Sequence, residues 1–198
     1  DYVNEEAGVS TVEDALAGAN DIIAEDLSDR ADIRKALREM IMRRGSLVCK
    51  AADTEADSVY TLYYDFNQPI PRLQNHQILA INRGEKEEIL KVSISVPGNE
   101  GAALVCRAAL KPQRDISLFV RAAAEDSYER LIFPSISREI RNELTDRASQ
   151  GAIHNFALNL KPLLMQPPVK GFVTMGLDPG YRNGCKVAVV DATGKVLD

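Results

Sequence analysis

The sequence predicts a mostly helical α+β protein with a bundle-like helical body, one long helix, a small strand element and a C-terminal β-hairpin. Three observations lead to this fold class. Apolar residues recur at three- and four-residue steps over most of the chain before Gln166, which is the helical period. That spacing holds over one long stretch from Ile136 to Leu163. After Pro167 and Pro168 the pattern changes to short, valine-rich runs separated by glycine-containing turns, which indicates strands.

Composition limits the classes of protein to which the chain can belong. Of its 198 residues, 45% are hydrophobic and 27% charged, as in an ordinary globular protein. No apolar run is long enough to cross a membrane, so we expect no membrane partner. Three widely separated cysteines without a C-x-x-C pair argue against a zinc site or a disulfide framework and favour the cytoplasm. The net charge of -5 argues against a chain that is a nucleic-acid-binding module throughout.

Two helices are predicted near the N-terminus. Ser10 and Glu13 have the spacing of a capping box, and the apolar stripe behind them predicts a helix over 11–27. A second apolar stripe begins at Ile33, and Gly45 ends that helix. Because the connection is so short, we expect the two helices to form an antiparallel hairpin.

Charge is segregated along these two helices. Residues 1–29 carry nine acidic side chains and no Lys or Arg, whereas residues 30–50 carry seven basic side chains and two acidic ones. In one interpretation, the two helices lie side by side and neutralise each other. In the other, the charges form an interaction surface for a protein or for nucleic acid, in which Arg34, Arg38 and Arg44 face a phosphate backbone.

The middle of the chain mixes short helices and strands. A short strand is predicted over 47–49, and a helix over 56–65 carries Tyr60, Tyr63 and Tyr64. These tyrosines either form a stacking platform for bases or pack against a neighbouring helix, and packing is the commoner arrangement. The pattern then predicts a short helix over 75–84, a strand over 90–96, and helices over 102–110 and 116–133.

The longest predicted helix begins anew at Pro134 and extends to Gln166. Proline is tolerated in the first turn of a helix, where its missing N–H would have no partner. We expect Pro162 to kink the helix or to fray its end, and a stiff proline linker follows.

After the linker, strands are predicted over 172–177 and 185–191, and a third begins at 195–197. Between the first two, Asp178 stands at the end of a buried strand, followed at once by Pro179 and Gly180. A carboxylate on such a rigid element suits Mg²⁺, which requires hard oxygen ligands in tight geometry. Asp-Pro-Gly is also an ordinary turn signal, and two-metal hydrolysis needs several converging carboxylates.

Other familiar catalytic motifs are absent from the sequence. It contains no G-x-x-x-x-G-K-[ST] phosphate loop, no G-x-G-x-x-G, no H-E-x-x-H and no G-x-S-x-G. Its two histidines, His76 and His154, lie far apart. Asp178 is therefore the single metal-ligand candidate, and no catalytic residue is assigned.

The segment from Phe172 to Asp191 closely resembles the opening of the YqgF-type, RNase H-like domain of Tex proteins, which are bacterial transcription accessory factors. Separate upstream stretches resemble Tex proteins as well, in the same order along the chain: Ser10–Asp26, Tyr64–Phe66, Ala80–Glu85 and Pro134–Arg141.

The resemblance implies binding of RNA or DNA by the full-length protein, a role in transcription and contact with the transcription machinery. It also implies two parts, a central helical region over 1–168 and the first strands of a truncated RNase H-like domain over 169–198. Asp178 corresponds to a metal-binding aspartate of related nucleases and resolvases, whose partner carboxylates are expected beyond Asp198. We therefore expect a non-catalytic scaffold without a cofactor, and Mg²⁺ binding only in a complete domain. The alternatives are a metal-dependent nuclease or resolvase in the full-length protein, or a protein-interaction module.

Overall fold

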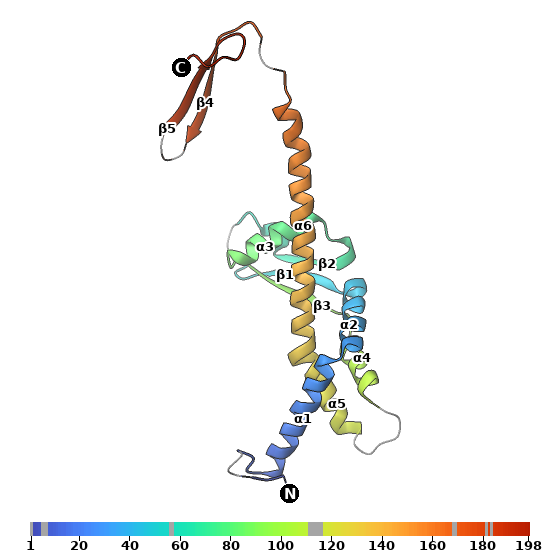
Figure 1. Ribbon diagram of the computed structural model, residues 1–198. Helices are drawn as coiled ribbons and strands as arrows, with labels where there is room; N and C mark the ends of the chain where they lie inside the picture. Colours follow the sequence, from blue (N-terminus) through green and yellow to red (C-terminus); the bar gives the residue numbers. More distant parts are fainter. Residues whose placement is uncertain are drawn as a thin grey trace. The chain divides into compact units, whose positions relative to one another are not determined.

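The fold is described from a computed structural model of the chain (Figure 1), over residues 2–4, 8–55, 58–110, 117–167, 170–180, 182 and 184–198. It confirms the mostly helical α+β class. The chain divides into two compact units, Asp1–Ala152 and Ile153–Asp198. The main helices are α1 (Val12–Asp29), α2 (Ala31–Arg44), α3 (Asn75–Lys86), α4 (Glu100–Ala109), α5 (Ser117–Asp126) and α6 (Phe133–Leu164), and the strands are β1 (Ser46–Ala51), β2 (Asp65–Pro69), β3 (Leu90–Ser95), β4 (Thr174–Gly180) and β5 (Gly184–Val190).

Helix α1 begins one residue later than the sequence suggests. The cap is Thr11, whose hydroxyl accepts a hydrogen bond from the Asp14 amide at 3.1 Å. The Asp14 carboxylate in turn accepts the amides of Thr11 at 3.0 Å and Ser10 at 3.2 Å. The predicted box of Ser10 and Glu13 is therefore wrong, because one shift along the chain lets a single carboxylate satisfy two free N–H groups.

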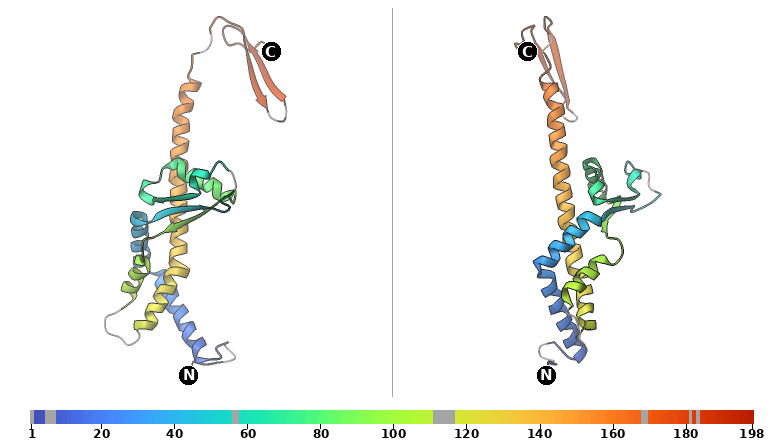
Figure 2. Two further views of the ribbon diagram at one scale, coloured as in Figure 1. Left: turned by 180° about the vertical axis from the view of Figure 1, so that it is seen from behind. Right: turned by 90° about the vertical axis from the view of Figure 1, so that its right-hand side faces the viewer.

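The predicted antiparallel hairpin of the first two helices is also wrong. Only Arg30 separates α1 from α2, and its backbone is extended, with φ -69° and ψ 112°. A single extended residue bends the chain but cannot reverse it, so α2 continues in the same general direction as α1 (Figures 1 and 2). Helix α1 packs against α5 instead and against the turn after it, where Ser127 donates a buried hydrogen bond of 2.7 Å to the Ala24 carbonyl.

The small sheet is antiparallel with strand order β2-β1-β3. Leu47 and Cys49 of the central strand β1 are buried and lie opposite Ile94 and Val92 of β3. The predicted helix over 56–65 is wrong: within the described part of that range, residues 58–65, the only helical turn is the 3₁₀ turn Thr61–Tyr63, and strand β2 follows. Pro69, the last residue of β2, and Pro71 just after the strand favoured a break in the chain over a strand, although proline is tolerated on an edge strand.

The tyrosines of this region take part in packing within the first unit. Tyr60 is buried, its ring lies against Gly84 of α3, and its hydroxyl donates to Glu87 at 2.9 Å. Tyr63 meets the ring of Phe66 edge-on, with ring centroids 5.4 Å apart. This arrangement matches the packing interpretation.

Helix α6 follows α5 without a break. A π-helical turn, Ser127–Ile132, joins them, and the Phe133 N–H donates to the Tyr128 carbonyl. The predicted new start at Pro134 is therefore wrong, because the wider turn accommodates a residue that lacks an N–H. One side of α6 is buried at every fourth residue, and its side chains beyond Ala152 are exposed; the buried residues are Ile136, Ile140, Leu144 and Ala148. Pro162 lies inside the helix, which ends two residues later at Leu164.

The second unit contains an antiparallel hairpin of β4 and β5, in which Thr174 pairs with Val190 and Gly180 with Gly184. The third strand predicted at 195–197 is reduced to one isolated bridge between Val196 and Val190. Most of the described side chains of β4 and β5 are exposed to solvent.

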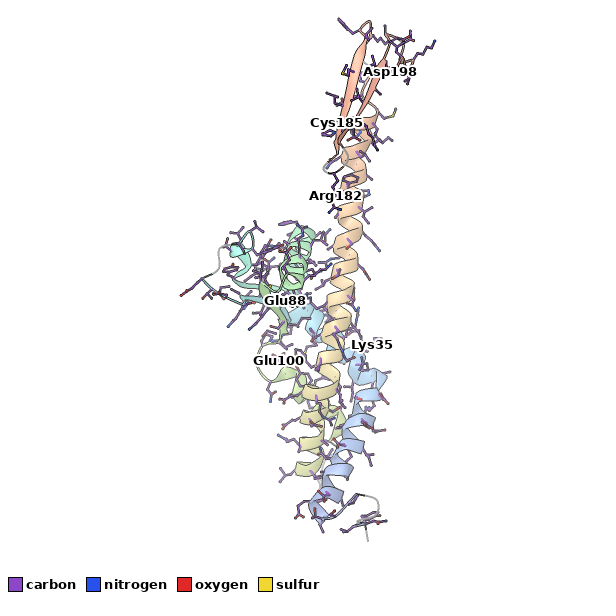
Figure 3. The ribbon with its side chains drawn as sticks, turned by 90° about the vertical axis from the view of Figure 1, so that its left-hand side faces the viewer. Lys35, Glu88, Glu100, Arg182, Cys185 and Asp198 are labelled. Carbon is purple, nitrogen blue, oxygen red and sulfur yellow. The ribbon has the colours of Figure 1, made fainter. Side chains whose placement is uncertain are left out.

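The three cysteines differ sharply in exposure, which gives a first prediction. Cys49 and Cys106 are buried, whereas Cys185 on β5 is exposed (Figure 3). Burial raises the pKa of the Cys49 thiol from 9.0 to about 11. We expect a thiol-specific alkylating agent to label Cys185 quickly and the other two only on unfolding. Mass spectrometry of partly labelled protein measures this, and rapid labelling of Cys49 would contradict the buried position.

The same raised pKa makes stability depend on pH. The unfolded chain ionises the Cys49 thiol more readily than the folded chain, so this contribution is complete below pH 9.0 and is lost as the pH rises toward about 11. Urea unfolding of wild type and Cys49→Ala across this range isolates the effect.

Candidate functional site

Asp178 lies on β4 with an exposed side chain, opposite Lys186 of β5. Within the described part of the chain, no three His, Cys, Asp or Glu side chains come close enough to hold a metal ion. Asp191 lies at the other end of the hairpin, where its carboxylate accepts hydrogen bonds within its own turn, from the Thr193 amide at 2.8 Å, the Thr193 hydroxyl at 2.7 Å and the Lys195 amide at 3.0 Å. These hydrogen bonds hold the pKa of Asp191 below its usual value. Asp178 is thus a single carboxylate without a converging second one among these residues.

The three arginines predicted to face a phosphate backbone each have a carboxylate partner. Their partners lie on α6 and α4, not on the acidic helix α1, so the predicted neutralisation of α2 by α1 is wrong. Asp21 of α1 instead pairs with Arg130 at 2.7 Å. The pairs are Arg34–Glu139 at 2.5 Å, Arg38–Glu143, and Arg44–Glu100 at 2.6 Å, where Glu100 is labelled in Figure 3.

These ion pairs connect α2 to α6 and α4, so the arginines contribute to packing between helices. Arg34 also donates to the Ser135 hydroxyl at 3.0 Å, so it links α2 to the first turns of α6. The pairs are partly exposed, and such pairs contribute at most about 1 kcal/mol each. Pairing lowers the local positive potential but leaves other guanidinium N–H groups free to bind. Contact with phosphate stays a prediction.

A second polar cluster joins α3 to α6 and escaped the sequence analysis. Arg141 donates to Glu85 at 2.5 Å and to Asn82 at 2.9 Å. Asn82 donates to Thr145 at 2.8 Å, and the Thr145 hydroxyl donates to the Arg141 carbonyl at 2.8 Å. Asn82 and Glu85 lie in one Tex-like stretch and Arg141 in another. The opposite charges of these two stretches, Glu85 in one and Arg141 in the other, were the signal that could have suggested contact between α3 and α6.

Two family models match consecutive parts of the chain. Residues 1–156 match the "Tex central region-like" model, and residues 172–198 match the "Tex protein YqgF-like domain" model. The linker and the end of α6 lie between the two matches.

Curated relatives match nearly the whole chain. Protein YdcI of Bacillus subtilis is 46% identical over 99% of the chain. Transcriptional accessory protein Tex of Neisseria gonorrhoeae is 32% identical over 100%, and human S1 RNA-binding domain-containing protein 1 is 31% identical over 96%. The chain spans 28%, 27% and 21% of the length of these three relatives.

These matches define the class of protein, in which a Tex-type central region is followed by a YqgF-like domain, here matched over residues 172–198. The chain belongs to the Tex family. None of the helices in the described residues combines the length and the hydropathy needed to cross a membrane.

Proposed function

We propose that the chain is a non-catalytic scaffold within a Tex-type transcription accessory protein. The full-length protein binds RNA or DNA and contacts the transcription machinery. Membership of the Tex family is the observation that carries this proposal. The names of two relatives, a transcriptional accessory protein and an S1 RNA-binding domain protein, are consistent with it.

The geometry of α6 supports a scaffold role. Its N-terminal half is fixed to the core by a buried apolar stripe and by the polar cluster around Arg141. Its C-terminal turns have exposed side chains and lead to the linker. A helix with half of its length anchored in the core suits a structural rather than a catalytic role. We propose that the helical region ends near residue 168 and that residues 169–198 are the first strands of an RNase H-like domain.

The isolation of Asp178 supports a chain without catalysis of its own. One exposed carboxylate holds Mg²⁺ weakly, and two-metal hydrolysis needs further ligands. We propose that Mg²⁺ binds there only in a complete domain. Free, unbridged cysteines in the described residues are consistent with a cytoplasmic setting.

Binding experiments on the chain and on a full-length Tex-family protein test the proposal. We expect a labelled single-stranded RNA to bind the full-length protein with a steep salt dependence, and to bind the chain at least about tenfold more weakly. Fluorescence anisotropy at several salt concentrations measures both. Equal affinity for the two proteins would place the main nucleic-acid contacts within this chain, and Arg34→Glu and Arg38→Glu would then identify them.

A further inference from the structure

Strand β3 forms one of the two edges of the small sheet in the first unit. β1 lies in the middle of the sheet, so β3 has a partner on one side only, and no described strand pairs with its other side. An edge strand presents alternating unpaired N–H and C=O groups, and proteins normally cover or block such an edge. The open edge of β3 is therefore a place where another chain can form hydrogen bonds.

A cavity of about 420 Å³ lies along this edge. β3 forms one wall and the N-terminal half of α6 forms another, so the cavity is a groove between a strand edge and a helix. Six polar residues and two apolar residues of β3 line it: Val92, Ser93, Ile94, Glu85, Ser137, Arg138, Arg141 and Asn142.

Two side chains on the α6 wall have hydrogen-bonding groups without partners. The Ser137 hydroxyl is buried and makes no hydrogen bond in the structure, which is unusual because buried hydroxyls are almost always paired. Arg138 is exposed and forms no ion pair with any described residue, in contrast to Arg141, which Glu85 and Asn82 hold. The groove thus combines a free hydroxyl, a free cation and a free strand edge.

We propose that this groove binds an extended acidic peptide, which adds to β3 as a further strand and places a carboxylate on Arg138. The edge offers donors and acceptors in alternation, and a peptide backbone matches both. A phosphodiester backbone offers acceptors only and would leave the β3 carbonyls unpaired. These points favour a peptide over a nucleic acid.

Each unpartnered group gains a role in this complex. The Ser137 hydroxyl donates to a carbonyl or carboxylate oxygen of the peptide, and the Arg138 guanidinium receives an Asp or Glu side chain. The apolar side chains Val92 and Ile94 contact every second residue of the added strand. This peptide site is independent of the nucleic-acid function proposed above.

Selection from a displayed library of random short peptides tests the proposal. The chain and its Arg138→Glu variant are panned in parallel, with Arg43→Glu as a matched control, because Arg43 is an exposed arginine of α2 without a described ion pair. We expect the wild type to enrich β-prone peptides with Asp or Glu at a fixed position. These peptides should bind Arg138→Glu at least about tenfold more weakly and Arg43→Glu with unchanged affinity. No enrichment, or equal loss in both variants, would overturn the proposal.

Synthetic versions of an enriched peptide test the strand geometry. In an added strand only every second peptide N–H faces β3, so N-methylation of one alternating set should abolish binding while methylation of the other set leaves it intact. Equal effects of the two sets would contradict strand addition. Ser137→Ala should lower the affinity for the peptide, while the thermal unfolding temperature of the protein stays equal or rises. Unchanged affinity would show that Ser137 is not part of the site. Displacement of the peptide by a labelled oligonucleotide whose binding also depends on Arg138 would assign the groove to nucleic acid.

Discussion

Replacing Leu144 with alanine is expected to destabilise the chain by about 2–5 kcal/mol, because it removes a fully buried side chain and leaves a cavity. Leu144 is 1% exposed and lies in the apolar stripe by which α6 joins the core. Urea unfolding followed by far-UV circular dichroism measures the loss. The slope of the transition should stay close to the wild-type value, since the same surface is exposed on unfolding.

The same substitution further along α6 provides a matched control. Leu163 is 62% exposed, so Leu163→Ala should change the free energy of unfolding by no more than about 0.5 kcal/mol. The contrast tests whether only the N-terminal half of α6 is anchored in the core. Equal losses for the two variants would contradict that division of the helix.

The second large effect is expected at Gly101, where α4 meets the π turn. A β-carbon at Gly101 would overlap Cζ, Oη and Cε2 of the Tyr128 ring. Phe133 lies against the same ring, with centroids 5.4 Å apart, and restricts its movement. We expect Gly101→Ala to cost about 1–3 kcal/mol of stability through overpacking.

Gly18 gives a control of opposite sign. It lies inside α1 with nothing within 4 Å of an added β-carbon, so Gly18→Ala should stabilise the helix by about 0.5–1 kcal/mol. A double-mutant cycle with Tyr128→Leu completes the test, because shortening the ring should remove most of the Gly101→Ala penalty. A penalty that persists without the ring would show that another contact causes it.

Elements with a long, uniform period were predictable from the sequence. The stripe of α6 recurs at every fourth residue over many turns, so the helix was identified, and its buried face was correct from Ile136 to Ala148. The stripe was expected to continue to Leu163, which is exposed. The alternation of β3 and the valine-rich pattern of β5 likewise predicted strands. Where a short element ends in proline, as β2 does at Pro69, the local signal is too weak to separate strand from turn.

The partners of charged residues were not predictable in this way. Arg34 and Glu139 are 105 positions apart, and the sequence offered acidic neighbours in α1 that the fold places elsewhere. The bend at Arg30 and the π turn before Pro134 determine which helix faces pack together. Neither feature can be recognised from the spacing of apolar residues in the sequence. The groove beside β3 depends on the same tertiary arrangement.

Cleavage of nucleic acid by the purified chain tests most directly whether this part of a Tex-family protein is framework or enzyme. The chain is incubated with Mg²⁺ or Mn²⁺ and with single-stranded RNA, single-stranded DNA or a branched DNA junction, beside its Asp178→Asn variant. A carboxylate that belongs to no metal-binding cluster of the described residues should leave every substrate intact, and the two proteins should give identical results. Metal-dependent cleavage by the wild type that disappears in Asp178→Asn would show that Asp178 assembles a working metal site within these 198 residues.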